Sequence, residues 1–263
     1  RIDPTVTLAF DATDNIHLYG KWGTAYRAGG ANSRSVTYRA YKPEEVETSE
    51  IGFKGEFLDR HVRLNLAAYK TIYKNQQIDF NAVLSEVPGG PTRTTIETVN
   101  VDGHGTIKGF EADLVVMPVE GLTLTAAYAY TKGDLAQAAN PFAGNALQTV
   151  FVVYTPKTAF SGAIDYSLPL DWATLRAHVD ANGGDGYHSQ SSDAALTDSS
   201  FLVNARLSLA DITLKGDAKL QISAWSRNLF NEQHTFFQTG SSSLQMGIFN
   251  EPRTYGLEAT VRF

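Results

Sequence analysis

The stretch RTYGLEATVRF, residues Arg253 to Phe263, alternates in side-chain character without a break. Apolar or aromatic side chains occupy every second position from Tyr255 onward, and the positions between them are polar, charged or glycine. Because successive side chains of a β-strand point to opposite faces, this pattern predicts a strand with one apolar and one polar face. Its length matches the roughly 9 to 11 tilted residues with which a strand crosses a bilayer.

The same alternation recurs upstream and predicts ten more strands. The expected strands lie at about 5–12, 16–27, 49–57, 62–68, 109–116 (with a start as early as Ile96), 122–130, 160–168, 175–181, 201–209 and 220–224. Charged side chains fall opposite the apolar positions, with Lys70 as an exception in phase. Either a β-bulge or a place near a rim would account for Lys70.

The connections between these segments alternate strictly in length. Short turns are expected at 12–15, 58–61, 118–121, 169–171 and 211–217, and long polar connections at 28–45, 76–95, 132–157, 183–199 and 229–252. This asymmetry is typical of transmembrane barrels. Aromatic residues near the strand ends fit interfacial girdles: Trp22, Tyr26, Tyr128, Tyr130, Phe160 and Tyr255. We therefore expect an all-β, antiparallel, up-and-down transmembrane β-barrel. A soluble sandwich or β-solenoid stays the alternative, since its strands also alternate.

Composition narrows the function classes. The net charge is −6 and no Lys/Arg run occurs, which argues against nucleic acid as a partner. Cysteine is absent, so we expect neither disulfides nor thiolate chemistry. The six histidines lack metal-ligand spacing and no catalytic constellation stands out, so we expect no metal, no cofactor and no enzyme activity.

The strand count bears on whether the barrel is whole. Residues 1–263 read as a single domain of eleven strands, whereas a closed antiparallel barrel in one bacterial chain normally has an even number. We therefore expect the sequence to be part of a larger barrel, with more chain upstream of Arg1.

Four segments together resemble the C-terminal half of TonB-dependent outer-membrane receptors. They are Tyr41 to Gln77, with its Pro-Glu and Glu-x-Gly-x-Lys elements; Lys108 to Glu111 (KGFE) followed by Gly121 to Leu124; Asn228 to Asn231 (NLFN); and Asn250 to Phe263. The resemblance implies a 22-stranded barrel with a plugged lumen, the plug domain and TonB box lying upstream. It also implies uptake of a scarce nutrient (a ferric siderophore, cobalamin or an oligosaccharide) driven by TonB, ExbB and ExbD. The outer-membrane assembly machinery would then recognise Phe263, together with Tyr255.

Ligand contacts are expected on the long loops. The first loop carries guanidinium and phenol groups suited to anionic or aromatic ligands, and later loops carry similar chemistry. The candidates are Arg27, Arg34, Tyr38, Arg39, Tyr41, Tyr187, His188, Phe236 and Phe237. Each is alternatively a solvated loop or girdle residue. Two other functions stay open: an autotransporter-type translocator, and a secreted β-rich enzyme or binding module.

Overall fold

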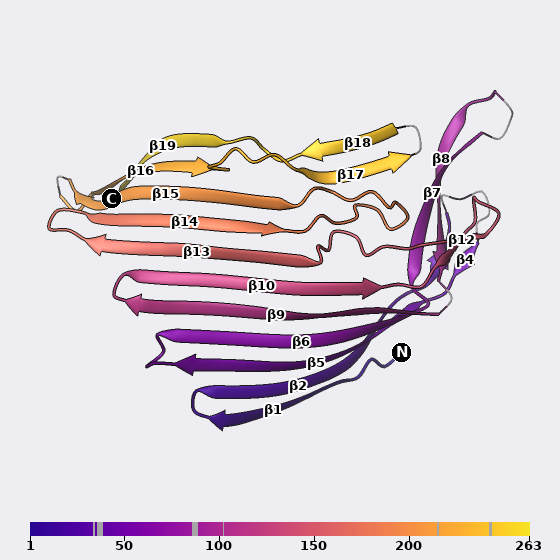
Figure 1. Cartoon of the computed structure of the whole chain (residues 1–263), viewed down its shortest axis with the longest axis horizontal. Helices are drawn as coiled ribbons and strands as arrows, with labels where there is room; N and C mark the ends of the chain where they lie inside the picture. Colours follow the sequence, from indigo (N-terminus) through magenta and orange to yellow (C-terminus); the bar gives the residue numbers. More distant parts are fainter. Residues whose placement is uncertain (34, 36–38, 86–88, 102, 215, 242–243) are drawn as a thin grey trace.

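A computed structural model describes residues 1–33, 35, 39–85, 89–101, 103–214, 216–241 and 244–263. Its main feature is an antiparallel sheet of eleven strands (Figure 1). In spatial order these are β1 (Thr5–Thr13), β2 (Ile16–Arg27), β5 (Glu44–Phe57), β6 (Val62–Lys74), β9 (His104–Val119), β10 (Leu122–Asp134), β13 (Thr158–Pro169), β14 (Thr174–Gly184), β15 (Ser200–Thr213), β16 (Lys219–Arg227) and β19 (Thr254–Arg262). Among the described residues no helix is long and apolar enough to span a bilayer.

Eight short strands form hairpins inside the long connections of the described chain. The pairs are β3 (Gly30–Ala31) with β4 (Ala40–Tyr41), β7 (Gln77–Ser85) with β8 (Thr92–Asn100), β11 (Ala138–Asn140) with β12 (Ala146–Gln148), and β17 (Thr235–Ser241) with β18 (Leu244–Phe249). Figure 1 shows β7, β8, β17 and β18 at the end of the sheet opposite the short turns. The predicted up-and-down topology with its long loops on one end is therefore confirmed.

One detail of the sequence prediction is wrong, and one alternative is decided. Residues 96–100 do not begin the long strand β9, because they belong to β8 and pair with β7. No bulge occurs at Lys70, because β6 keeps an unbroken register from Val62 to Lys74 against both β5 and β9. Lys70 instead lies in the last third of β6, toward the long loops.

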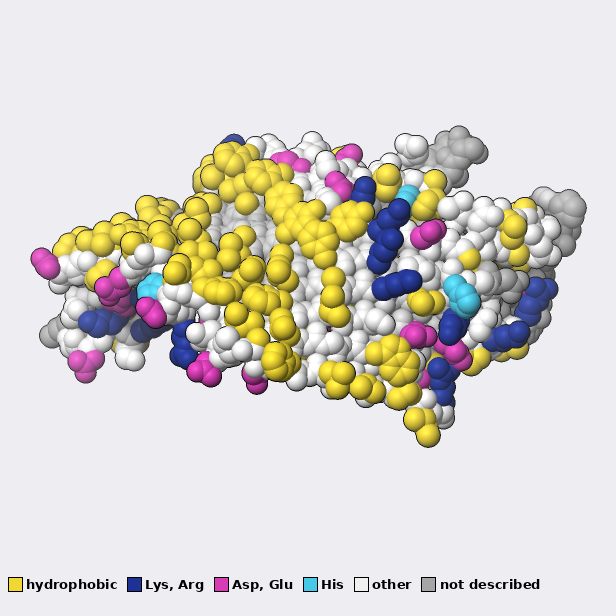
Figure 2. Space-filling model, turned by 60° about the horizontal axis from the view of Figure 1, so that its bottom comes forward, with side chains coloured by type: hydrophobic (Ala, Val, Ile, Leu, Met, Phe, Trp, Pro, Cys, Tyr) yellow, Lys and Arg dark blue, Asp and Glu magenta, His cyan; other side chains and the backbone are white. Residues whose placement is uncertain are grey.

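The apolar side chains of the sheet lie on an open outer face. Leu8, Ile51 and Leu257 are 75%, 67% and 83% exposed, and Figure 2 shows hydrophobic side chains gathered in a broad band on one face. In water this much exposed apolar surface would be strongly unfavourable, whereas hydrocarbon solvates it. No second sheet packs against this band in the described part of the chain, so the sandwich alternative is excluded.

The sheet is not closed. In the described chain β1 pairs only with β2, and β19 pairs only with β16. Each end strand therefore has one row of backbone donors and acceptors without a strand beside it, a state that barrels avoid by closing. The observed sheet is thus a partial barrel, as the strand count predicts.

Candidate functional site

The inner wall of the sheet carries paired charges. Nη2 of Arg206 lies 2.7 Å from Oε1 of Glu258, and Nη2 of Arg176 lies 2.7 Å from Oδ2 of Asp211. His178 lies between two carboxylates, with Nδ1 2.7 Å from Asp165. These side chains alternate with the apolar ones, because a charge facing lipid would cost about 2–4 kcal/mol at the midplane. The wall is therefore suited to water or to a polar protein segment.

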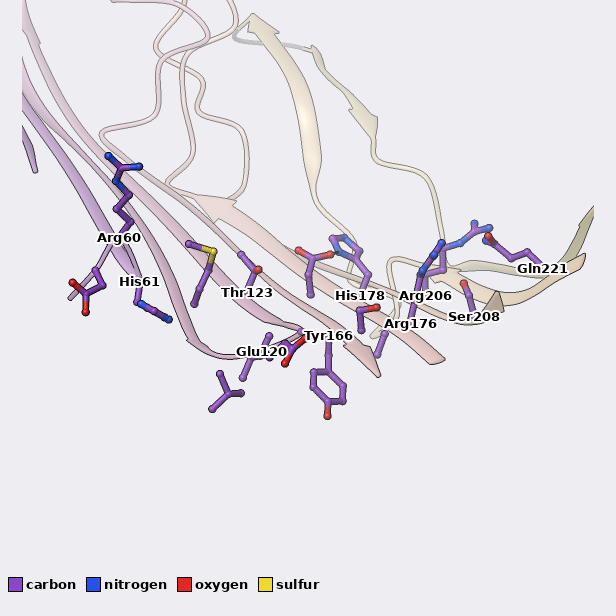
Figure 3. A pocket seen from close by; sticks show the side chains of 18 residues that line it. Arg60, His61, Glu120, Thr123, Tyr166, Arg176, His178, Arg206, Ser208 and Gln221 are labelled. Carbon is purple, nitrogen blue, oxygen red and sulfur yellow. Dashed lines mark hydrogen bonds and ion pairs between the residues drawn. The ribbon is translucent and has the colours of Figure 1, made fainter. Parts of the chain in front are cut away.

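The wall is hollowed near the short turns. A cavity of about 830 Å³ lies there, lined by charged and hydroxyl side chains together with apolar ones such as Met117 and Val119 (Figure 3). Arg60, Thr123, Arg176, His178 and Ser208 are among the lining residues. This hollow lies at the end of the sheet opposite the predicted ligand residues, and sequence reasoning did not single it out.

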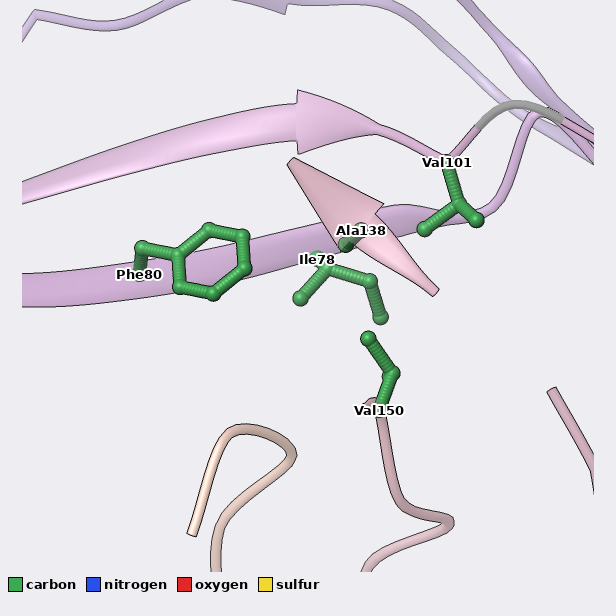
Figure 4. Close-up of a cluster of buried hydrophobic side chains, with 5 residues drawn as sticks. All are labelled: Ile78, Phe80, Val101, Ala138 and Val150. Atoms are coloured by element: carbon green, nitrogen blue, oxygen red, sulfur yellow. The ribbon is translucent and has the colours of Figure 1, made fainter. Parts of the chain in front are cut away.

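The long loops form a layer with a hydrophobic core of its own. Ile78, Phe80, Val101, Ala138 and Val150 are each at most 4% exposed and pack together (Figure 4). They come from β7, the end of the β7–β8 hairpin, β11 and the chain after β12. Loops usually remain solvated, so this buried cluster shows that the loop layer is a structured cover.

The first group of predicted ligand residues also holds the loops in place. Arg27 donates to the carbonyl of Gln77 at 3.1 Å and to Glu44 at 3.5 Å. Arg39 is exposed and lies 3.8 Å from the buried carboxylate of Glu97. Tyr41 is half-buried and pairs with Gly30 in the β3–β4 hairpin. Arg34 and Tyr38 lie outside the described residues.

The structure brings the second group together from distant parts of the chain. The hydroxyl of Tyr187 donates to the carbonyl of Phe236 at 2.6 Å, although 49 residues separate them. The ring of His188 stacks on Phe151 with centroids 3.9 Å apart. Phe236 keeps an exposed side chain, and Phe237 is half-buried. Aromatic groups on this part of the loop layer are therefore available to a ligand, and their binding role stays a prediction.

Two aspartates hold this second group of residues in place by hydrogen bonds, and sequence reasoning did not predict them. The carboxylate of Asp193 accepts from the backbone N–H groups of Ala195 and Gly240, at 2.9 and 2.7 Å, and from the Thr239 hydroxyl at 3.0 Å. Asp198 accepts from both the N–H and the hydroxyl of Thr235 at 2.9 Å. The sequence signal for these two residues was an Asp in a Ser-rich loop, because Asp side chains accept hydrogen bonds from nearby backbone N–H groups.

The pKa values of both aspartates are lowered. Burial alone would raise the pKa of Asp193, but the hydrogen bonds from Ala195, Gly240 and Thr239 outweigh it. The N–H and the hydroxyl of Thr235 lower the pKa of Asp198. The ionised carboxylates thus favour the docked arrangement of loop 185–199 on β17.

We expect this docking to weaken in acid. A carboxylate with a lowered folded-state pKa contributes stability that is present above its unfolded pKa of about 4 and is lost as the pH falls through the folded value. Hydrogen exchange of residues 235–240, corrected for intrinsic rates, should therefore accelerate as the pH falls below about 4. In the D193N/D198N variant, protection should be lower at neutral pH and nearly independent of pH. Unchanged wild-type protection across that range would contradict the assignment.

No metal centre is formed by the described residues, where no group of three or more His, Cys, Asp or Glu side chains could hold an ion. What the geometry provides is a lipid-facing band, a charged inner wall and a packed layer of loops at one rim. Together these features define a segment of an outer-membrane β-barrel.

The chain belongs to the family of TonB dependent receptor-like β-barrels, whose model matches residues 2–260. The resemblance seen in the sequence is thereby confirmed, and membership places the chain in the outer membrane. It also decides against the autotransporter-type translocator and the secreted β-rich module.

Particular relatives are known siderophore receptors. The chain is 23% identical to the ferric-pyoverdine 358 receptor of Pseudomonas putida over 96% of its own length and 28% of that protein's. It is 25% identical to the ferric-pyoverdine M114 receptor PbuA of a Pseudomonas strain, over 70% of this chain and 21% of that protein. The ferric yersiniabactin uptake receptor FyuA of Yersinia pestis shares the fold, with a TM-score of 0.76 and 15% identity over 98% of this chain and 37% of that one. The chain thus spans 21% to 37% of the length of these relatives.

Proposed function

We propose that this chain is part of an outer-membrane receptor that takes up a ferric siderophore by TonB-dependent active transport, with no enzyme activity. The observation that carries the proposal is an open partial barrel with a polar inner wall, in a chain whose relatives are named as receptors for ferric pyoverdines. Cobalamin and oligosaccharides remain the other cargo classes that the family resemblance implies.

The loop layer supplies the binding chemistry in this proposal. Many ferric siderophores, catecholate types above all, carry negative charge and flat, polarisable metal-chelating groups. Guanidinium groups such as that of Arg39 suit the charge, and exposed rings such as that of Phe236 suit stacking. Because the loops are cross-linked by the Tyr187 and Asp193 hydrogen bonds, a ligand would meet a preorganised surface and would lose less ordering entropy on binding.

The inner wall supplies the transport path. In the complete protein we propose about eleven further strands, which would pair with the free edges of β1 and β19, and a plug domain inside the lumen. The hollow lined by Arg60, Met117 and His178 offers both polar and apolar side chains on which such a plug could seat. TonB, with ExbB and ExbD, would act on the plug side, and the assembly role of Phe263 and Tyr255 stays a prediction.

Binding and uptake by the full-length protein test this proposal. We expect at least one ferric siderophore from a panel of hydroxamate, catecholate and mixed types to bind with a Kd below about 1 μM, measured by calorimetry. The iron-free forms serve as the control. Cells that express the protein should accumulate radioactive iron from that complex only when TonB is present.

Two outcomes would count against it. Tight binding of cobalamin or an oligosaccharide, with none of any ferric siderophore, would change the cargo class. Equal iron accumulation with and without TonB would remove active transport.

A further inference from the structure

Three lysines form a row across the outer face of the sheet. Lys70 of β6 stands directly opposite Lys108 of β9, and Lys108 stands directly opposite Lys132 of β10. All three side chains are exposed. They share a face with the lipid-facing residues Ala68, Phe110 and Tyr130, each of which lies two positions from a lysine on the same strand, toward the short turns. Phe110 stands opposite both Ala68 and Tyr130, just as Lys108 stands opposite Lys70 and Lys132.

The lysine row lies at the boundary of the apolar band. The rings of Phe110 and Tyr130, in the adjacent row, stack with centroids 5.9 Å apart and belong to the aromatic girdle. Lys157 adds a fourth cation nearby, with Nζ 5.9 Å from the centre of the Tyr130 ring. Figure 2 shows Lys and Arg side chains gathered beside the hydrophobic band. Since aromatic girdles lie at headgroup depth, the lysines lie at the level of the lipid headgroups on the long-loop side.

The row is electrostatically uncompensated within the described chain. None of Lys70, Lys108 and Lys132 has a carboxylate within ion-pair distance there, and like charges directly opposite each other on a sheet are destabilising. Of the acidic side chains further out on this face, Glu47 is engaged by Lys74 at 3.7 Å and by Trp22 at 3.1 Å. Asp134 stands opposite Thr106, one row beyond the lysines.

We propose that the row binds the phosphate groups of a phosphorylated glycolipid in the outer leaflet of the outer membrane. Charge complementarity and depth argue for this occupant. Strands lie about 4.8 Å apart, so three adjacent lysines span about 10 Å, which suits a headgroup that carries two phosphates. The acyl chains of the same lipid would then cover the aromatic and aliphatic side chains below. The site is independent of the nutrient carried, because it faces away from the lumen.

Native mass spectrometry of the full-length protein in detergent tests the site. The probes are a bisphosphorylated lipid A glycolipid, its dephosphorylated form and phosphatidylglycerol. We expect the K70Q/K108Q/K132Q variant to bind the bisphosphorylated glycolipid at least about tenfold more weakly than the wild type, since each surface lysine contributes about a factor of five. The K70R/K108R/K132R variant, which keeps the charge, should bind as the wild type does.

The inner-wall variant K21Q/K54Q/K219Q is the matched control, because it removes the same charge from the opposite face of the sheet. It should retain the glycolipid. The single K108Q variant, which removes only the central cation, keeps the test decisive if the triple variant does not fold. Unchanged glycolipid binding by the folded glutamine variants, or equal binding of the dephosphorylated lipid, would overturn the proposal. Equally tight phosphatidylglycerol binding would overturn the assignment to a glycolipid.

Discussion

Replacing Ile164 with arginine is expected to lower the stability of the membrane-inserted barrel by about 2–4 kcal/mol, which corresponds to about 30-fold to 1000-fold in the folding equilibrium. Ile164 lies near the middle of β13, is 51% exposed on the lipid-facing side and pairs with Leu124 and Val179. A guanidinium at this depth would be placed in hydrocarbon, far from either interface, and could not easily reach headgroups or water.

The matched control for this prediction is Thr125→Arg. Thr125 pairs with Ala163, one residue from Ile164, but faces the inner wall. The two variants therefore carry the same charge at nearly the same depth on opposite faces. Urea titration of the full-length protein folded into lipid vesicles should show a large loss for Ile164→Arg and a small one for Thr125→Arg. Equal losses of stability would contradict the assignment of Ile164 to the lipid-facing side and of Thr125 to the lumen side.

Replacing Phe80 with alanine is expected to cost the loop layer about 3–5 kcal/mol. Phe80 is 1% exposed and belongs to the cluster with Ile78, Val101, Ala138 and Val150. Its removal takes a large apolar side chain out of contact and leaves a cavity between the segments that this core joins. The sheet itself should remain intact, because Phe80 lies outside its eleven strands.

Hydrogen exchange separates the two parts of the molecule in this experiment. Protection of residues 77–80 and 96–101 should fall in the Phe80→Ala variant, while protection of β13 to β15 should not change. The control is Phe249→Ala, because Phe249 is 53% exposed in β18 and contributes little buried area. Full protection of the β7–β8 hairpin in the Phe80→Ala variant would contradict a loop layer held by its core.

In these two expectations, the sheet and the loop layer are stabilised by different interactions. The sheet is stabilised by lipid on one face and by hydrogen-bonded ladders along every strand, so its side chains toward the lumen are free to be polar. The loops have no lipid to contact and need a core of their own, supplemented by charge-assisted bonds such as those of Asp193 and Asp198. The sheet can therefore serve as a fixed frame for the loops, to which the proposed function assigns recognition.

The sequence by itself determined the sheet. Period-two alternation, as in Tyr255 to Phe263, is a local property that depends only on neighbouring side chains, so it located all eleven strands and assigned their faces. Alternating connection lengths placed the long loops at one rim for the same reason, because strand direction reverses at every turn. The early start of β9 was misread, because β7 and β8 interrupt one long loop. Of the two explanations offered for Lys70, the bulge is absent and the place near the rim is observed.

Only the tertiary structure decided how the long loops pack against one another. The contact of Tyr187 with Phe236, the bonds of Asp198 to Thr235 and the burial of Val150 in one cluster with Phe80 join segments that are distant in sequence. No local periodicity encodes such pairs. The row of Lys70, Lys108 and Lys132 likewise became visible only through cross-strand register. Register fixes which side chains on different strands are neighbours, and it is set by the pairing of whole strands rather than by any one of them.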